Sequence, residues 1–267
     1  MTYETLTLDK QGHLATIKLN RPKIFNPLDE VSGAELVAAL EKCGWDNDIR
    51  VVILTGEGKA FSAGGNVRMM KSFVDDHPDL DGGQIFEQIT KLLNRSILTI
   101  RNLPKPVVAA LNGVASGGGL SWVLACDMVI AADTARLDTG YIRIAVNPDG
   151  GLSWILPRLI GHKRATEFLM LAEEMSAAKA LELGLVNKMV PEKDLLSESI
   201  ILATRLSKKP ALALAATKRL MNGSVFYGLA AQLERERQEI IQAGGTHDFK
   251  EGLAAFFEKR PPAFNTR

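Results

Sequence analysis

The sequence predicts an α/β fold, and three of its features support that prediction. Short, continuous apolar runs at 51–54, 106–111 and 128–132 are typical of buried parallel strands, which are covered on both faces. Stretches with apolar residues at helical spacing alternate with these runs, and short glycine turns join the two kinds of segment. In such folds the ligand site lies where strands end and helices begin, so we expect functional residues at those turns.

The chain begins with a predicted antiparallel hairpin. Residues 3–8 and 13–19 alternate apolar and polar side chains, and the segment 9–12 between them ends on a glycine. A helix is predicted over 29–43, because apolar residues recur there every three or four positions. This helix precedes the first of the buried strands.

The rest of the chain repeats the alternation and then becomes helical. We predict helices at 84–103, 118–126, 163–173 and 176–183, and a strand at 185–190. The polar segment 72–84, which contains glycine and proline, is predicted to be a mobile loop. From about 195 onward, alanine and leucine stripes favour helices that pack on a neighbouring subunit over a simple lid. We therefore divide the chain into a core at 1–195 and a helical oligomerisation region at 196–267.

Composition and charge narrow the class of protein. The 267 residues include 32 basic and 31 acidic side chains, so the chain has almost no net charge and is not expected to bind nucleic acid. Cys43 and Cys126 are too few for a disulfide framework and lack the close Cys/His spacing of a zinc site. Neither a secretory leader nor a stretch of about 18 apolar residues is present. We expect a cytoplasmic protein without a membrane segment.

Two glycine turns are the first candidates for a functional site. The segments 58–67 (GKAFSAGGNV) and 112–119 (NGVASGGG) each lie between a predicted strand and a predicted helix. Small residues let a ligand approach the main chain, and N–H groups at a helix start attract negative charge. Two such turns could aim two donors at one developing oxyanion. Neither segment matches the usual phosphate-binding patterns, and a purely structural role remains the alternative.

Five segments, in this order and spacing, resemble the crotonase superfamily, the enoyl-CoA hydratase/isomerase family. They are 20–26 (NRPKIFN), 59–65 (KAFSAGG), 105–119 (KPVVAALNGVASGGG), 126–127 (CD) and 251–260 (EGLAAFFEKR). The resemblance implies a crotonase, or ClpP-like, spiral of ββα units whose core holds an acyl-CoA. It also implies that the C-terminal helices form trimers, often paired into hexamers.

The resemblance also assigns residues to the acyl-CoA. It implies that the thioester oxygen is held by the N–H groups of Gly65 and Gly118, and that the adenine lies near Ala60, Phe61, Ser62 and Ala63. Lys23 and a neighbouring subunit's Phe256 and Lys259 are implied around the nucleotide phosphates, with ordinary surface roles as the alternative. Coenzyme A enters only as part of the substrate, and no metal or redox cofactor is expected.

The acidic residues distinguish this chain from hydratases of the family. Ser121 and Tyr141 stand where those hydratases carry two glutamates, and neither side chain replaces a carboxylate near neutral pH. Asp149, in the segment 147–151 (NPDGG) ahead of 156–158 (LPR), matches an aspartate that family isomerases with a P-D-x-G segment use as their base. A Pro-Asp-Gly turn is also a common structural element.

The implied reaction is a shift of a double bond, from a 3-enoyl-CoA or a cyclic or aromatic-derived thioester. Asp149 would remove a proton, Gly65 and Gly118 would hold the dienolate, and Asp149 would return the proton at another carbon. Ser121 and Tyr141 are interpreted as substrate contacts, with the alternative that Tyr141 only fills the space of the missing carboxylate.

Three alternatives stay open. Asp149 could activate water in a hydratase, or act as a nucleophile in an aroyl-CoA dehalogenase or hydrolase, although the helix at 84–103 lacks the histidine of those relatives. The fold could also serve only to bind an acyl-CoA or RNA. Asp138 is a candidate second acid but is expected to be solvated, and His77 is a weaker candidate contact.

Overall fold

The structure, a computed structural model, describes residues 2–265 and is built on a large sheet with the strand order β1-β2-β3-β5-β7-β10. Only the first pair is antiparallel, and it forms the predicted hairpin, with Gly12 in the turn at a φ of 57°. The other neighbours in the sheet are parallel, as predicted. The strands are Leu6–Gln11 (β1), Leu14–Leu19 (β2), Val51–Gly56 (β3), Val107–Leu111 (β5), Met128–Ala132 (β7) and Lys188–Val190 (β10).

A second, smaller sheet was not predicted, because its strands are only two or three residues long. It has the order β4-β6-β8-β9. Each of β3, β5 and β7 in the large sheet is followed along the chain by one strand of the small sheet, so the chain winds through both sheets in a spiral of ββα type. The strands are Ala60–Ser62 (β4), Val114–Ser116 (β6), Arg136–Asp138 (β8) and Met175–Ser176 (β9).

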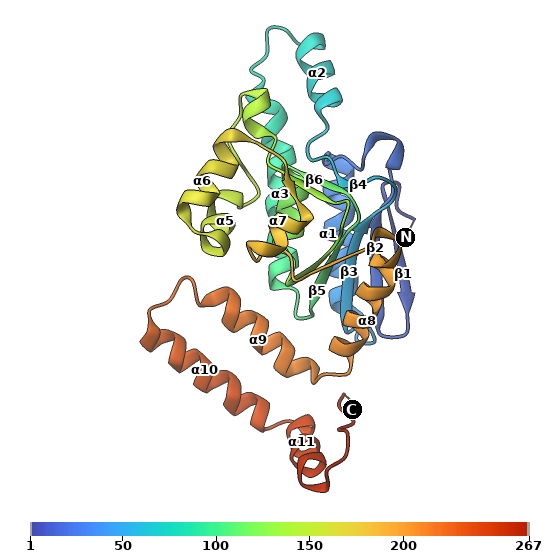
Figure 1. Ribbon diagram of the computed structural model, residues 1–267, viewed down its shortest axis with the longest axis vertical. Helices are drawn as coiled ribbons and strands as arrows, with labels where there is room; N and C mark the ends of the chain where they lie inside the picture. Colours follow the sequence, from blue (N-terminus) through green and yellow to red (C-terminus); the bar gives the residue numbers. More distant parts are fainter. Residues whose placement is uncertain (1, 266–267) are drawn as a thin grey trace.

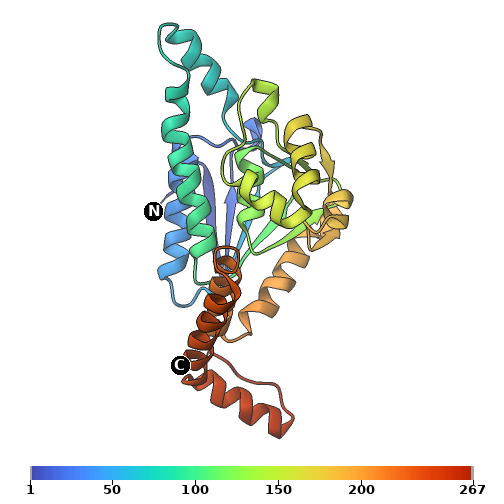
Figure 2. The ribbon, with the colours of Figure 1, turned by 90° about the vertical axis from the view of Figure 1, so that its left-hand side faces the viewer.

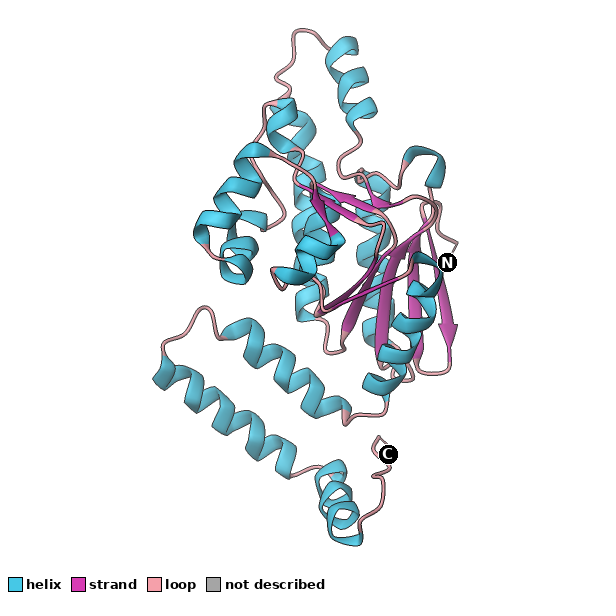
Figure 3. Cartoon of the chain, viewed as in Figure 1, coloured by secondary structure: helices cyan, strands magenta, loops and turns pink. Residues whose placement is uncertain are grey.

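Helices cover the sheets, as Figure 3 shows in cyan around the magenta strands. The predicted helices are confirmed with small shifts of their ends. Asp29 and Ser32 form a reciprocal capping box that starts α1. The helices of the core are Glu30–Trp45 (α1), Val67–Asp76 (α2), Gly83–Asn102 (α3), Gly118–Ala125 (α4), Leu152–Ile160 (α5), His162–Leu171 (α6) and Ala177–Glu182 (α7). Three short 3-10 turns are Pro22–Ile24, Tyr141–Ile144 and Glu192–Asp194.

Two predictions about this part of the chain were incomplete. The segment 72–84 is not one loop, because α2 continues to Asp76 and α3 begins at Gly83. The helix α5 was not predicted from the sequence. Pro157 lies inside it, and a proline within a segment argues against a helix there. Figure 1 shows α2 projecting from the top of the core and connected to α3 by the intervening turn.

The C-terminal region is helical, as predicted, and its helices are Leu195–Ser207 (α8), Ala211–Gly223 (α9), Leu229–Gly244 (α10) and His247–Glu258 (α11). The first of them, α8, packs on the large sheet of its own chain. In contrast, α10 and α11 extend away from the core at the end opposite α2 (Figures 1 and 2). No helix between residues 2 and 265 is long and apolar enough to cross a membrane.

Candidate active site

The two glycine turns lie in direct contact with each other. Gly64 has a φ of 81°, and a methyl group added to it would lie 2.6 Å from the carbonyl oxygen of Ser116 and 3.4 Å from Cα of Gly117. The first turn is also fixed to the segment before α1, because the N–H of Leu28 donates to the carbonyl of Gly64 at 2.6 Å. The spiral therefore brings together two turns that lie about fifty positions apart in the sequence.

The N–H groups of Gly65 and Gly118 both belong to this contact region. Gly118 is the first residue of α4, where the N–H groups of the first turn have no partner within the helix. Within residues 2–265, neither N–H takes part as donor in a main-chain or side-chain hydrogen bond outside regular helices and strands. Both glycines line the same cavity.

Asp149 lies at the same cavity, on the turn that leads into α5. This turn is closed by Gly150 and Gly151, whose φ angles are 55° and 83°. A methyl group on Gly150 would lie 2.5 Å from Oγ of Ser121. The Gly150 main chain therefore packs tightly against α4, and this close approach sets where the Asp149 carboxylate is held.

One hydrogen bond joins Asp149 to Tyr141. The phenol of Tyr141 donates to Oδ1 of Asp149 at 2.6 Å. Burial raises the pKa of Asp149 above its usual value, and the hydrogen bond from Tyr141 acts in the opposite direction. Burial and the nearby carboxylate raise the pKa of Tyr141, so the phenol keeps its proton as a donor. Asp149 is thus a carboxylate of increased basicity with one oxygen already bonded.

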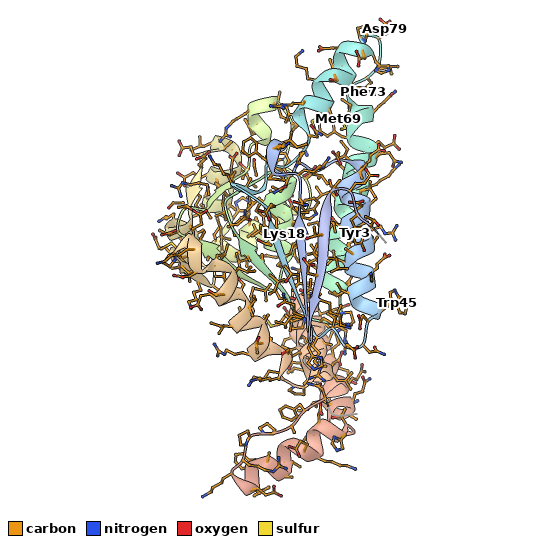
Figure 4. The ribbon with its side chains drawn as sticks, turned by 90° about the vertical axis from the view of Figure 1, so that its right-hand side faces the viewer. Tyr3, Lys18, Trp45, Met69, Phe73 and Asp79 are labelled. Carbon is orange, nitrogen blue, oxygen red and sulfur yellow. The ribbon has the colours of Figure 1, made fainter. Side chains whose placement is uncertain are left out.

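The cavity has a volume of about 300 Å³ and is mostly apolar. Asp149 is the only carboxyl group among its lining residues in the described part of the chain. Met70 from α2 reaches the first glycine turn, since a methyl group on Gly65 would lie 2.6 Å from its Cε. Figure 4 shows α2 at the upper end of the molecule, with Met69 and Phe73 labelled. The apolar lining consists of Leu28, Val67, Met70, Phe86, Ile89, Ile144 and Val146.

Only some of the residues predicted to contact the acyl-CoA line the cavity. Ala63 lines the cavity, whereas the side chains of Ala60, Phe61 and Ser62 are buried in the core, so only their main chain could meet an adenine. Ser121 is fully buried and does not line the cavity; its hydroxyl lies 3.4 Å from the carbonyl oxygen of Asp149. The structure thus places Ser121 behind the cavity wall, where its small size admits the Gly150 turn.

The two candidates from the C-terminal region lie far from this chain's own cavity. Phe256 is 77% exposed on α11, and Lys259 ends that helix, at the opposite end of the molecule from α2 (Figure 1). Lys23 is exposed on the first 3-10 turn. A single chain therefore brings together Gly65, Gly118, Tyr141 and Asp149, but not Phe256 or Lys259.

Asp138 and His77 differ from what the sequence indicated. Asp138 is buried, not solvated, and Arg143 bonds both of its oxygens at 2.9 Å. The hydroxyl of Ser116 donates to the same carboxylate, so Asp138 is fully engaged beneath the second glycine turn. His77 is exposed, stacks on Phe73 at 4.8 Å between ring centroids, and is absent from the cavity lining among the described residues.

Sequence reasoning missed the Asp138–Arg143 pair. It did place residues 68–75 at the pocket, and Met70 of α2 lines the cavity as expected. No local pattern indicated the ion pair. The chain turns at Gly140, which is in the left-handed region, and this turn brings Arg143 back to Asp138.

Comparison with known proteins gives a consistent assignment. Residues 9–267 match the family model described as enoyl-CoA hydratase/isomerase. A protein of Rhodobacter capsulatus described as a probable enoyl-CoA hydratase is 34% identical over 267 residues, all of both chains. The 1,2-epoxyphenylacetyl-CoA isomerase of Escherichia coli is 34% identical over 249 residues, covering 93% of this chain and 94% of that one. The crystal structure of an enoyl-CoA hydratase from Bacillus anthracis superimposes with a TM-score of 0.91 at 33% identity, over 99% and 100% of the two chains.

The fold and the cavity therefore define an enzyme that acts on acyl-CoA thioesters. The chain belongs to the enoyl-CoA hydratase/isomerase family.

Proposed function

We propose that this enzyme is an enoyl-CoA isomerase that moves a double bond from the 3 to the 2 position of an acyl-CoA, with Asp149 as its base. The observation that supports this most is that Asp149 is the single carboxyl group, among the described lining residues, at a cavity that is also lined by Gly65 and Gly118. Hydration by two glutamates has no counterpart here, because Ser121 and Tyr141 occupy those positions.

The proposed reaction uses one base for two proton transfers. The N–H groups of Gly65 and Gly118 bind the thioester oxygen, and Asp149 removes a proton from C2. The electron pair of that C–H bond enters a dienolate whose negative charge rests on the thioester oxygen. Asp149 then gives the same proton to C4, the double bond settles between C2 and C3, and the carboxylate is regenerated. The reaction consumes no co-reactant and needs no cofactor beyond the coenzyme A of the substrate.

The electrostatics of Asp149 favour this role. Its raised pKa, caused mainly by burial, makes the carboxylate a stronger base for an acidic C–H bond. The apolar lining contributed by Phe86, Ile89 and Val146 excludes water from the dienolate. Both features support isomerisation over hydration, which needs a water molecule held by a second acid.

The test is double-bond migration in a panel of 3-enoyl-CoA thioesters, including cyclic and phenylacetate-derived ones, followed by the absorbance of the conjugated product. We expect Asp149→Asn to lose about a thousandfold in turnover, as removal of an essential acid–base group does. Asp133→Asn is the matched control, because Asp133 is exposed and its carboxylate bonds only the main-chain N–H of Glu192 among the described residues.

Hydratase activity is the second candidate, since a relative of this chain carries that name. If 2-enoyl-CoA is converted to 3-hydroxyacyl-CoA faster than 3-enoyl-CoA is isomerised, the isomerase proposal is wrong. Binding of CoA thioesters without turnover of either substrate would point to a binding protein instead.

We also propose that the enzyme assembles as a trimer, alone or paired into a hexamer. The support is the exposure of large apolar side chains on the C-terminal helices, such as Leu229 at 75% and Phe257 at 78%. In such an assembly, a neighbouring subunit's Phe256 and Lys259 would complete the nucleotide end of the acyl-CoA site, beside Lys23.

A further inference from the structure

The position that holds a glutamate in family hydratases is filled here by Tyr141, whose phenol points at the candidate base. Its hydroxyl donates to Oδ1 of Asp149 at 2.6 Å, and only 8% of the residue is exposed. We propose that Tyr141 is a positioning residue: it holds Oδ1 of Asp149 so that Oδ2 is the oxygen that carries the proton between the two substrate carbons. This inference rests on the proposed function, since it assigns a partner to the base.

The main chain around Tyr141 is fixed on both sides. Tyr141 starts a short 3-10 turn between Gly140 and Ala145, which have φ angles of 66° and 59°. Its N–H donates to the carbonyl of Thr139 at 2.8 Å, and its carbonyl accepts from the N–H of Val146 at 3.2 Å. A phenol on such a turn has little freedom to leave the carboxylate.

A second set of contacts ties the same turn to the core. Arg143 bonds both oxygens of Asp138 at 2.9 Å and also donates to the carbonyl of Ala172. Asp138 in turn accepts from the hydroxyl of Ser116, on the strand that leads into the second glycine turn. The buried pair therefore links the segment that carries Tyr141 to the turn that carries Gly118.

Tyr141 also lies between the base and the oxyanion donors. A methyl group added to Gly117 would lie 3.6 Å from Cζ of the Tyr141 ring and 3.8 Å from its hydroxyl. The ring thus fills the space beside the second glycine turn while its hydroxyl points to Asp149. Because burial raises the pKa of the phenol, Tyr141 stays protonated and acts as donor throughout the neutral range.

The charged groups around Asp149 determine the sign of the expected effect. Burial raises the pKa of Asp149, while the bond from Tyr141 lowers it. The other cavity-lining residues from the first glycine turn, α2, α3 and α4 are uncharged in the described part of the chain. The neighbouring Asp138 is already paired with Arg143. Loss of the phenol should therefore raise the pKa of Asp149 with no other charge to offset the change.

The test compares the pH dependence of kcat/KM for 3-enoyl-CoA isomerisation in the wild type and in Tyr141→Phe. Ionisation of Asp149 switches the reaction on as the pH rises, so this profile has an acidic limb. We expect Tyr141→Phe to move that limb to higher pH by about one unit and to lower the plateau about tenfold, because the carboxylate is no longer oriented. Tyr3→Phe is the matched control: Tyr3 has no hydrogen-bond partner within residues 2–265 and lies beside α1, on the N-terminal segment (Figure 4).

The outcomes separate this inference from the proposed function. If Asp149→Asn is inactive but Tyr141→Phe keeps the wild-type profile and plateau, Tyr141 only fills space and the inference is wrong. If Asp149→Asn remains active, the proposed function itself fails.

A second measurement covers the case in which Tyr141→Phe does not fold. The chain has three tyrosines, so wild-type protein labelled with ¹³C at tyrosine Cζ gives three resonances. We expect one of them to titrate with the midpoint of the acidic limb in the wild type and to lose that titration in Asp149→Asn. A set of three resonances that are all insensitive to Asp149 would overturn the assignment.

Discussion

Gly64 and Gly65 are adjacent residues, yet a side chain would meet very different surroundings at the two positions. At Gly64 the φ of 81° is unfavourable for any other residue, and a methyl group would lie 2.6 Å from a main-chain oxygen. At Gly65 the only close atom is the end of the flexible Met70 side chain. The first turn therefore needs a glycine at 64 for its shape, whereas at 65 the close contact is with a side chain that can move.

This difference predicts unequal losses of stability. We expect Gly64→Ala to lower the free energy of unfolding by about 2 kcal/mol or more, through left-handed strain and the main-chain clash. Gly65→Ala should cost less than about 1 kcal/mol, because Met70 can change rotamer. Urea denaturation of both variants measures the difference, and equal losses would show that the two positions are not distinguished in this way.

At the scale of single residues, the sequence predicted the residues that belong to short local motifs. It did not predict the contacts that form only when the chain folds back on itself. Gly65, Gly118 and Asp149 were chosen from short segments, and all three line one cavity. The bond between Tyr141 and Asp149 was not predicted, because it depends on a chain reversal through left-handed residues such as Ala145. A solvated Asp138 was predicted for the same reason, since its partner Arg143 is brought back by that reversal.

At the scale of elements, a buried ammonium group helps to attach α9 to the core. Nζ of Lys218 donates to the carboxylate of Asp127 at 2.7 Å and to the carbonyls of Ile100 and Lys105 at 2.7 and 3.1 Å. Burial lowers the pKa of Lys218 and raises that of Asp127, each against the attraction of its partner. All three donors of the ammonium group are used, so this contact joins α9 to α3 and to the entry of β7.

Removal of this lysine should therefore be costly. We expect Lys218→Met to lower the free energy of unfolding by about 1–3 kcal/mol, because the carbonyls of Ile100 and Lys105 and the carboxylate of Asp127 would lose their shared donor. Arg219→Met is the matched control: the pair of Arg219 with Glu239 is half exposed, and its loss should cost less than about 1 kcal/mol. Thermal and urea unfolding measure both variants, and a cost at Lys218 no larger than at Arg219 would contradict this reading.

The elements that the sequence predicted are those with a long hydrophobic pattern. The buried runs of β3, β5 and β7 and the stripe of α3 were identified within a few residues of their ends. The strands of the small sheet are too short to show a period of two, so pairing in three dimensions defines them. The helix α5 was missed because its pattern is interrupted by Pro157.

At the scale of the whole molecule, the outer face of α10 has nothing to cover it within the described chain. Leu229, Leu233 and Ile240 are 75%, 54% and 71% exposed, and their spacing places them on one side of the helix. A neighbouring side of the helix, about 100° away, faces α9 through the pair of Arg219 with Glu239. An apolar helix face that is exposed to solvent is typical of a surface that packs on another subunit. We therefore expect this face of α10 to be buried against another copy of the chain.

This face gives the last prediction. We expect the wild type to sediment as a trimer of the 29.0 kDa chain, or as a pair of such trimers, and Leu233→Asp/Ile240→Asp to sediment as single chains. The double variant should also raise the KM for the acyl-CoA about tenfold or more, because its own Phe256 and Lys259 lie far from its own cavity. Gln238→Asp is the control, since it adds one carboxylate, half the charge of the double variant, on the other side of α10. A wild type that sediments as a single chain would remove the neighbouring subunit from the site, and the nucleotide end of the acyl-CoA would then have to be held by Lys23 and the β4 main chain alone.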